Sequence, residues 1–161
     1  MGIFQKLFGK KLDSICAPVA GEAVPISQVS DPTFGEEILG KGIAIQPADG
    51  KVVAPCDATV DMMFETGHAV SLVADFGAEI LIHVGLDTVN LKGKHYSVKV
   101  ASSAKVKKGD LLISFDMEGI RSEGYSLSTH MAVCNSEDYA SVRALTTGPV
   151  QVGDDVLEIQ G

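Results

Sequence analysis

The sequence contains few cysteines and few basic residues, and it has no long apolar run. Its three cysteines, Cys16, Cys56 and Cys134, are odd in number and form no C-x-x-C pair. A disulfide framework is therefore not indicated, and a reducing cytoplasm fits. No stretch approaches the ~18 uninterrupted apolar residues of a membrane-spanning helix. Residues 1–12 hold only short apolar pairs broken by lysines, so no secretory signal is recognised and a cytoplasmic location is expected.

The shortage of basic side chains makes the chain acidic. Thirteen Lys and Arg stand against 21 Asp and Glu, for a formal net charge of -8. This excess would repel a phosphate backbone, so no nucleic-acid partner is expected. A length of 161 residues fits one domain with its own core. We expect a flexible basic tail over residues 1–16 and a single domain over residues 17–161.

The tail differs in charge and pattern from the rest of the chain. Residues 1–12 carry Lys6, Lys10 and Lys11 and no acid, which leaves ten basic and 21 acidic side chains, a net charge of -11, on residues 13–161. Apolar side chains at positions 3, 4, 7 and 8 would share one face of a short helix. The pattern suits weak contact with an anionic membrane surface through residues 1–12. A frayed terminus or a segment folded onto the body are the alternatives.

Beyond the tail, short Val- and Ile-rich runs alternate with Gly, Pro and Asp. Runs of this kind at residues 42–45, 51–54, 69–73 and 79–84 predict an all-β protein, an antiparallel sandwich or barrel. Two brief helical turns are expected, at residues 32–39 and 138–145. The first has Asp31 as N-cap, Pro32 at the first helical position and Gly40 past the end.

Weak internal repeats support the all-β prediction. The segment Ala17–Gly21 is echoed by Ala54–Ala58, and Val106–Leu112 is echoed by Val150–Val156. The second pair reads as strand, Gly-centred turn and strand, because glycine supplies a positive φ and aspartate tolerates turn conformations.

Two of the four histidines fall where strands could place them side by side. In the run 79–84, alternation puts Ile80, Ile82 and Val84 on one face and His83 on the other. His68 shares a face with Thr66, across a glycine that permits close approach. The alternative for each is a satisfied polar residue within a sheet.

A neighbouring pair of histidines has three common uses: a metal site, an acid–base pair, or a nucleophile with a stabilising partner. A neutral imidazole nitrogen attacks phosphorus well, and a second imidazole can donate to a phosphoryl oxygen. Asp87, four residues after His83, is expected to receive a ring proton and fix the tautomer.

The metal hypothesis takes a specific form. The spacing His83-x-x-x-Asp87 matches part of the zinc signature of lysostaphin-type peptidases, but the H-x-H of that family is absent. Catalytic zinc takes three protein ligands, so a metal bridging His68 and His83 would need ligands from a partner. A G-x-x-x-x-G-K match at Gly35–Lys41 is set aside, because Gly42 replaces the Ser or Thr that holds magnesium.

The segment Glu79–Gly93, EILIHVGLDTVNLKG, closely resembles the active-site segment of the glucose-family enzyme IIA of the bacterial phosphotransferase system. Other segments follow in family order: Ala17–Glu22, Gly40–Pro47, Val53–Pro55, Phe64–Val70, Val106–Asp110 and Phe115–Asp116. The resemblance covers residues 17–161, and the tail resembles that of stand-alone members.

The resemblance implies a phosphocarrier with the fold of a duplicated hybrid motif, an antiparallel β-sandwich. His83 would take a phosphoryl group from the phosphohistidine of HPr and pass it to a cysteine of the IIB domain of a IIB/IIC sugar permease. His68 would stabilise the phosphoryl oxygens, Thr66 would hydrogen-bond near the site, and Asp87 would lie beside it. No cofactor is required. An apolar partner-binding rim is implied at Phe34, Ile38, Leu39, Phe64, Leu81 and Val89, with core packing as the alternative, above all for Ile38 and Leu81.

Some residues depart from the family pattern. Many members carry Ser-Thr-x-Thr-Pro where this chain has Ser128-Thr129-His130-Met131-Ala132. His130 and His95 are both interpreted as structural or surface residues.

A second hypothesis is a regulator that binds permeases or kinases when unphosphorylated, with zinc held between His68, His83 and a partner's carboxylate. A zinc peptidase is the third.

Overall fold

The computed structural model describes residues 12–161, and the expected membrane-contacting tail therefore lies almost wholly outside the described residues. Three antiparallel sheets form the fold. Leu12–Cys16, the last five residues of the expected tail, pair with Asp155–Gln160 as β1 and β14. No helix within residues 12–161 has the length and apolar character needed to cross a membrane.

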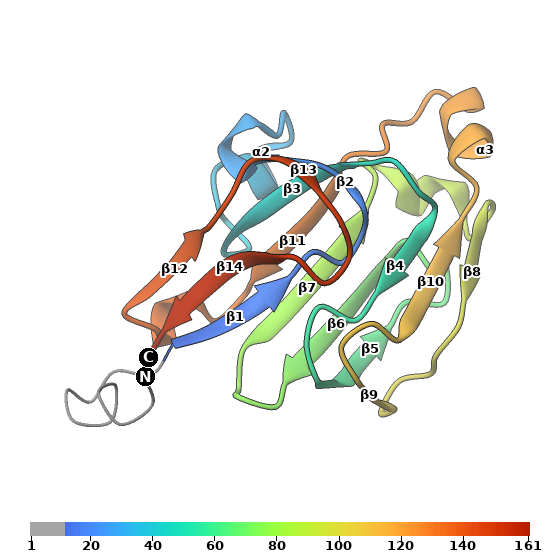
Figure 1. The fold of residues 1–161 in the computed structure, drawn as a ribbon. Coiled ribbons are helices and arrows are strands. Elements are labelled where there is room, and N and C mark those ends of the chain that lie inside the picture. The colour runs from blue at the N-terminus through green and yellow to red at the C-terminus, as the bar shows by residue number, and fades with distance from the viewer. Residues whose placement is uncertain (1–11) are drawn as a thin grey trace.

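Figure 1 shows two small sheets lying in front of one large sheet. The large sheet has eight strands, in spatial order β13 (Gly148–Val150), β2 (Gly21–Pro25), β3 (Lys41–Pro47), β11 (Thr129–Val133), β7 (Glu79–Val84), β6 (Ala69–Ala74), β5 (Ala58–Met63) and β9 (Lys105–Val106). The small sheets are β1–β14–β12 and β4–β10–β8, which add β12 (Ser141–Ala144), β4 (Lys51–Val53), β10 (Leu111–Phe115) and β8 (Tyr96–Val98). The predicted antiparallel β-sandwich is confirmed, and each predicted strand run is a strand.

The two halves of the large sheet have matching strand arrangements, one built from the two ends of the chain and the other from its middle. From one edge the large sheet runs β13, β2, β3, β11, and from the other it runs β9, β5, β6, β7. The predicted repeat is visible in atomic detail at the two glycine turns. The amide of Lys107 donates to the Asp110 carboxylate, and that of Gln151 donates to Asp154, both at 2.8 Å. The two halves of the sheet therefore meet at the central pair β11–β7.

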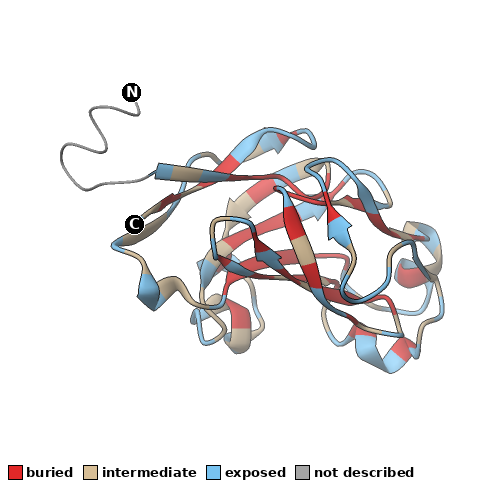
Figure 2. Ribbon diagram, turned by 90° about the horizontal axis from the view of Figure 1, so that it is seen from below, coloured by how far each residue is buried: buried red, intermediate tan, exposed pale blue. Residues whose placement is uncertain are grey.

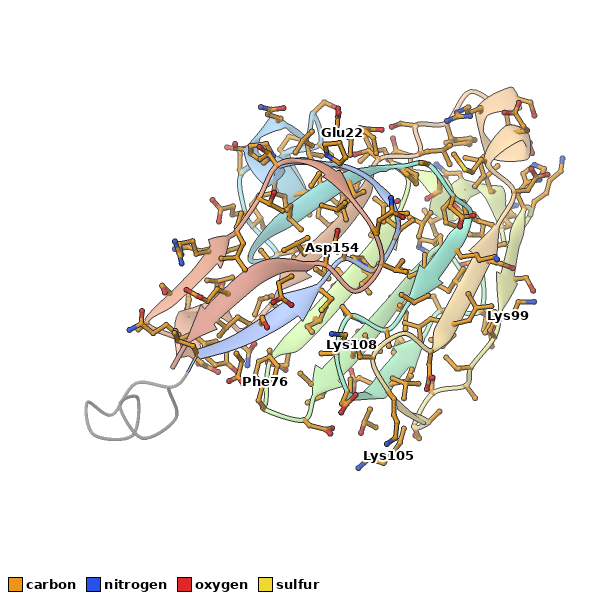
Figure 3. The ribbon with its side chains drawn as sticks, in the orientation of Figure 1. Glu22, Phe76, Lys99, Lys105, Lys108 and Asp154 are labelled. Carbon is orange, nitrogen blue, oxygen red and sulfur yellow. The ribbon has the colours of Figure 1, made fainter. Side chains whose placement is uncertain are left out.

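The core lies between the sheets, where the buried residues gather on facing strands (Figure 2). Its largest fully buried members are Ile15, Ile43, Ile45, Leu72, Ile80, Ile82, Leu112, Ile113, Ile120, Met131, Leu157 and Ile159. Charged side chains stay at the outside, and Figure 3 shows Lys99 and Lys105 pointing away from the edge formed by β8, β9 and β10. Strict alternation along strands such as β7 buries every second residue.

Helical structure is brief and only partly as predicted. Asp31 caps α2 (Pro32–Gly35), accepting from the Thr33 amide at 2.9 Å, but the helix ends at Gly35 and not beside Gly40. The helix expected at residues 138–145 is wrong: this stretch holds the end of η3 and the strand β12, where Val142 pairs with Ile159. The remaining helical elements are η1 (Ile26–Gln28), η2 (Thr88–Leu91), α3 (Met117–Ser122) and η3 (Ser136–Asp138).

Candidate active site

His83 stands on the outer face of the large sheet, near its centre. Along β7 the side chains of Ile80, Ile82 and Val84 are buried in the core, and those of Leu81 and His83 lie half-buried on the opposite face. The predicted alternation is therefore confirmed. Because β7 has a neighbour on each side, β6 and β11, the backbone that carries His83 is held from both directions.

A backbone carbonyl orients the His83 ring. Nδ1 of His83 lies 2.8 Å from the carbonyl oxygen of Gly85. A carbonyl oxygen only accepts, so Nδ1 carries the ring hydrogen and Nε2 keeps a free lone pair. Gly85 reaches this position with φ of +89°, and a Cβ there would lie 2.4 Å from the Thr88 side chain.

We expected Asp87 to fix the tautomer of the His83 ring, and this prediction is wrong, because the Gly85 carbonyl is the partner of Nδ1. Asp87 is exposed and precedes η2 with φ of +60°, and no hydrogen bond joins it to His83 within residues 12–161. Its carboxylate acts through charge alone, since it favours the protonated ring of His83.

His68 lies directly against His83, as the sequence predicted. The ring centroids are 5.1 Å apart, and the planes meet at 81°. Nδ1 of His68 lies 2.5 Å from the Thr66 hydroxyl oxygen, and the Val84 amide donates to the His68 carbonyl at 2.7 Å. The edge of Phe64 packs on the His68 ring at a centroid distance of 5.4 Å. The expected partnership of Thr66 and His68 is thus present as a hydrogen bond.

Burial keeps both rings uncharged. Burial, followed by repulsion from His83, lowers the pKa of His68 to about 4. Burial also lowers the pKa of His83, opposed by the Gly85 carbonyl and by the carboxylates of Asp31 and Asp87. Both histidines are consequently neutral at pH 7, which is the state in which an imidazole nitrogen acts as a nucleophile.

The residues of the predicted partner-binding rim differ in how far each side chain is buried. Phe34 is only 5 % exposed and packs beside His83 at a centroid distance of 5.4 Å, so it forms a wall of the site. Ile38 and Val89 are 69 % and 51 % exposed, which excludes the alternative of core packing for Ile38. The half-buried members are Leu39, Phe64 and Leu81.

Sequence reasoning missed two side chains at this site. His130, interpreted as a structural or surface residue, is completely buried, pairs across strands with His83 and stacks on Phe34 at 4.3 Å. Asp31 was recognised only as a helix cap, yet its charge acts on the rings of both His83 and His130. The second histidine outside the predicted pair, His95, instead bonds Glu123 beside α3.

The residues that the structure describes offer too few ligands to support a zinc site within this chain. Within residues 12–161 no group of three or more His, Cys, Asp and Glu side chains is placed to hold a metal ion. His68 and His83 alone fall short of the three protein ligands of a catalytic zinc. The peptidase alternative is therefore not supported.

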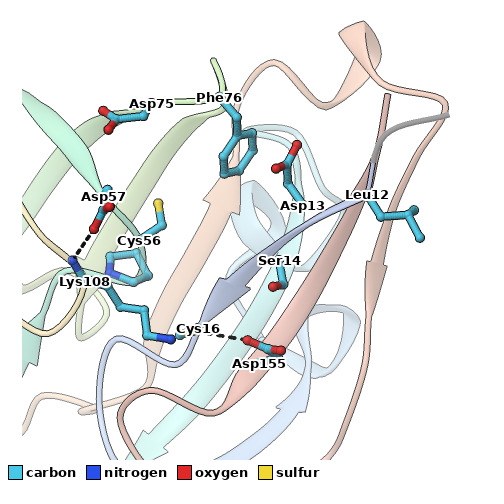
Figure 4. A pocket seen from close by; sticks show the side chains of 11 residues that line it. Leu12, Asp13, Ser14, Cys16, Cys56, Asp57, Asp75, Phe76, Lys108 and Asp155 are labelled. Carbon is cyan, nitrogen blue, oxygen red and sulfur yellow. Dashed lines mark hydrogen bonds between the residues drawn. The ribbon is translucent and has the colours of Figure 1, made fainter. Parts of the chain in front are cut away.

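A cavity of about 580 Å³ beside β1 is chemically unsuited to a phosphoryl group (Figure 4). Four carboxylates and one lysine line it, together with two thiols. Burial raises the pKa of the Cys56 thiol to about 12 and also raises that of Cys16, so neither is a nucleophile at pH 7. The carboxylates belong to Asp13, Asp57, Asp75 and Asp155.

Comparison with known proteins identifies the family of this chain. Residues 13–139 match the family model for the phosphoenolpyruvate-dependent sugar phosphotransferase system, EIIA 1. A β-glucoside-specific EIIBCA component of Dickeya chrysanthemi is 42 % identical over 91 % of this chain, and this chain covers 23 % of that relative's length. A glucose-specific EIIA component of Staphylococcus epidermidis is 41 % identical, with coverage of 94 % of this chain and 98 % of that one.

A solved structure has the same fold. The glucose permease IIA from Mycoplasma capricolum matches with a TM-score of 0.85 and 29 % identity, over 92 % of this chain and 96 % of that chain. The sequence match, the strand topology and the solved relative agree. The chain belongs to the EIIA 1 family of the phosphoenolpyruvate-dependent sugar phosphotransferase system.

Proposed function

We propose that this chain is a phosphocarrier in sugar uptake, with Nε2 of His83 as the atom that accepts and donates the phosphoryl group. The observation that carries the proposal is the 2.8 Å hydrogen bond from His83 Nδ1 to the Gly85 carbonyl. It leaves the lone pair of Nε2 free on a neutral ring, which is the form that attacks phosphorus. Family membership supports the same chemistry.

The transfer exchanges one phosphorus–nitrogen bond for another. Nε2 of His83 attacks the phosphorus of the phosphohistidine of HPr in line with the departing nitrogen, and the donor bond breaks as the new bond forms. In the second step a IIB cysteine thiolate attacks the same phosphorus, and His83 leaves as a neutral ring. The protein supplies position and charge stabilisation.

His68 and Thr66 are proposed to stabilise the phosphoryl oxygens. With the Thr66 hydroxyl donating to Nδ1 over 2.5 Å, the ring hydrogen of His68 sits on Nε2. That N–H can then donate to a phosphoryl oxygen on His83, whose ring lies 5.1 Å away between centroids. Because the donor is held in place before the reaction, little reorganisation is needed during transfer.

The surroundings of His83 suit protein partners. Ile38 and Val89 offer exposed apolar contacts, and Asp31 and Asp87 place negative charge beside the acceptor. This pattern fits a basic phosphodonor protein such as HPr, steered by charge. The EIIBCA relatives, whose names join the three parts A, B and C, support a IIB/IIC permease as the acceptor partner. The proposal places this exchange in the cytoplasm.

Labelling with radioactive phosphoenolpyruvate, enzyme I and HPr tests the proposal. Wild type should acquire an acid-labile, base-stable phosphoryl group. His83→Ala should acquire none, whereas His68→Ala should be labelled and should pass the label slowly to a IIB domain. His95→Ala, which changes a histidine outside the site, is the matched control and should behave as wild type. Equal labelling of wild type and His83→Ala would overturn the assignment.

A further inference from the structure

The third histidine of the site, His130, has an unusual position for a buried polar residue. It lies in β11 directly opposite His83 in β7, and cross-strand partners of this kind point to the same face of a sheet. The two ring centroids are 6.1 Å apart. His130 has no exposed surface in the unphosphorylated protein, so an incoming protein cannot contact its ring directly.

One nitrogen of this ring has no hydrogen-bond partner. Nε2 of His130 lies 3.0 Å from the Ser128 hydroxyl, and Nδ1 is buried without a partner among residues 12–161. Buried polar atoms are nearly always paired, and leaving one unpaired is unfavourable. If His130 served packing alone, an apolar side chain would stabilise the fold more, because it would bury no unpaired nitrogen. The unpaired Nδ1 therefore suggests that His130 functions in another state of the site.

The charged and titratable groups that face His130 are few. His83 faces it from β7, and the Asp31 carboxylate acts on it from the segment before α2. On its other side β3 presents Ala44, and Phe34 stacks on the ring with an interplanar angle of 23°. In the unphosphorylated protein, burial and then His83 lower the pKa of His130 to about 4, so the ring is neutral.

We propose that His130 is a positioning residue of the phosphotransfer site, which binds a proton when His83 becomes phosphorylated. The inference rests on the proposed function. As the donor bond breaks and the His83 Nε2–phosphorus bond forms, His83 keeps its Nδ1 hydrogen on the Gly85 carbonyl. The dianionic phosphoryl group on a cationic ring adds one net negative charge, and His130 takes one proton from solvent to balance it.

The separation of the rings sets the size of the effect. Taken as one net negative charge placed at the His83 ring, about 6 Å away, at an effective dielectric constant of about 20, the added charge raises the pKa of His130 by roughly two pH units. The sign is fixed: a pKa raised by phosphorylation favours the phosphorylated form at low pH, and this advantage is lost as pH rises through the raised pKa. The charged ring would also hold Phe34 more firmly, through a cation–π contact.

Nitrogen-15 NMR of the full chain labelled at histidine measures the charge of each ring directly. Spectra of the unphosphorylated chain are recorded from pH 3.5 to pH 8, and spectra of the chain phosphorylated by HPr with phosphoenolpyruvate regeneration from pH 5 to pH 8; His130 is assigned from the His130→Gln spectrum. The pKa of His130 should rise by at least one pH unit on phosphorylation. An unchanged titration of His130 in a protein phosphorylated at His83 would overturn the inference.

A second measurement uses the transfer equilibrium with HPr. The ratio of the wild-type to the His130→Gln equilibrium constant should fall about fourfold between pH 5.5 and pH 7.5, because the variant takes up no proton at this position. Met131→Leu, a change of similar volume on the opposite face of β11, should follow wild type. Equal pH dependence in wild type and His130→Gln refutes proton uptake. Failure to label His83 at all refutes the proposed function instead.

Discussion

Acidification should destabilise the unphosphorylated protein through its buried histidines. His68 and His130 are neutral in the folded chain because burial lowers the pKa of each from 6.5 to about 4. A folded-state pKa below the unfolded value means that the unfolded chain binds the proton more tightly. The stability present above pH 6.5 is therefore lost as pH falls from 6.5 toward 4.

The magnitude follows from the size of that depression. For one ring, the change from 6.5 to about 4 corresponds to about 3.4 kcal/mol when protonation is complete. Between pH 7.5 and pH 4.5 the loss is about 2.5 kcal/mol for each ring. Two rings together remove roughly 5 kcal/mol, a large share of the 5–15 kcal/mol typical of a domain.

Urea unfolding followed by circular dichroism isolates the contribution of one ring. The free energy of unfolding is measured at pH 7.5 and pH 4.5 for wild type, His130→Gln and Met131→Leu. Wild type should lose about 2.5 kcal/mol more than His130→Gln on acidification. Met131→Leu should lose as much as wild type, because no titrating group is removed. If wild type and His130→Gln lose the same amount, His130 is not a buried neutral histidine.

Three further predictions concern the site and the strand that supports it. Thr66→Val, which removes the partner of His68 Nδ1, should slow transfer to IIB about fivefold in rapid-quench assays, since one hydrogen bond contributes about 1 kcal/mol. An unchanged rate would show that Thr66 does not orient His68. Ile38→Ser should lower kcat/KM for phosphorylation by HPr about tenfold and shift the free energy of unfolding by less than about 0.5 kcal/mol, because Ile38 is exposed. Unaltered kinetics would remove Ile38 from the docking surface. Gly42→Ala should destabilise by about 3 kcal/mol or more in urea unfolding, because its Cβ would lie 1.8 Å from the Met131 carbonyl oxygen. A wild-type midpoint would contradict this clash.

Local signals in the sequence were sufficient for much of the fold and for the central histidine pair. The alternation in β7 depends on neighbouring residues alone, and it placed His83 on the outer face correctly. The repeated glycine turns also depend on a few adjacent residues, as the matching bonds of Asp110 and Asp154 show. Interactions within four residues, such as Thr66 with His68, were likewise open to sequence reasoning.

What the sequence could not predict depends on pairing between distant segments or on the backbone. His130 meets His83 only because β11 pairs with β7 in one register, and a shift by one residue would turn it to the other face. The Gly85 carbonyl is a backbone group, so no pattern of side chains in the sequence reveals its hydrogen bond with His83. The stretch 138–145 was misassigned because a short edge strand, held by β14, has too few residues to show a period. A histidine two residues after a serine in a β-rich run was the one available signal for His130.

The Gly85 carbonyl reconciles two demands that a phosphocarrier places on one imidazole. Before transfer, Nε2 must be unprotonated and the ring neutral, which the bond from Nδ1 ensures. After transfer, the ring must be a good leaving group, and a phosphorylated imidazole leaves more readily when its other nitrogen keeps a hydrogen, because it then departs neutral. A carbonyl can hold that hydrogen in both states, since it only accepts and does not titrate. An aspartate at this position would change its charge interaction with the ring at each step, and Asp87 accordingly lies outside hydrogen-bonding contact. In the mechanism that we propose, the same bond therefore serves both acceptance and donation, which is what reversible transfer between two partners requires.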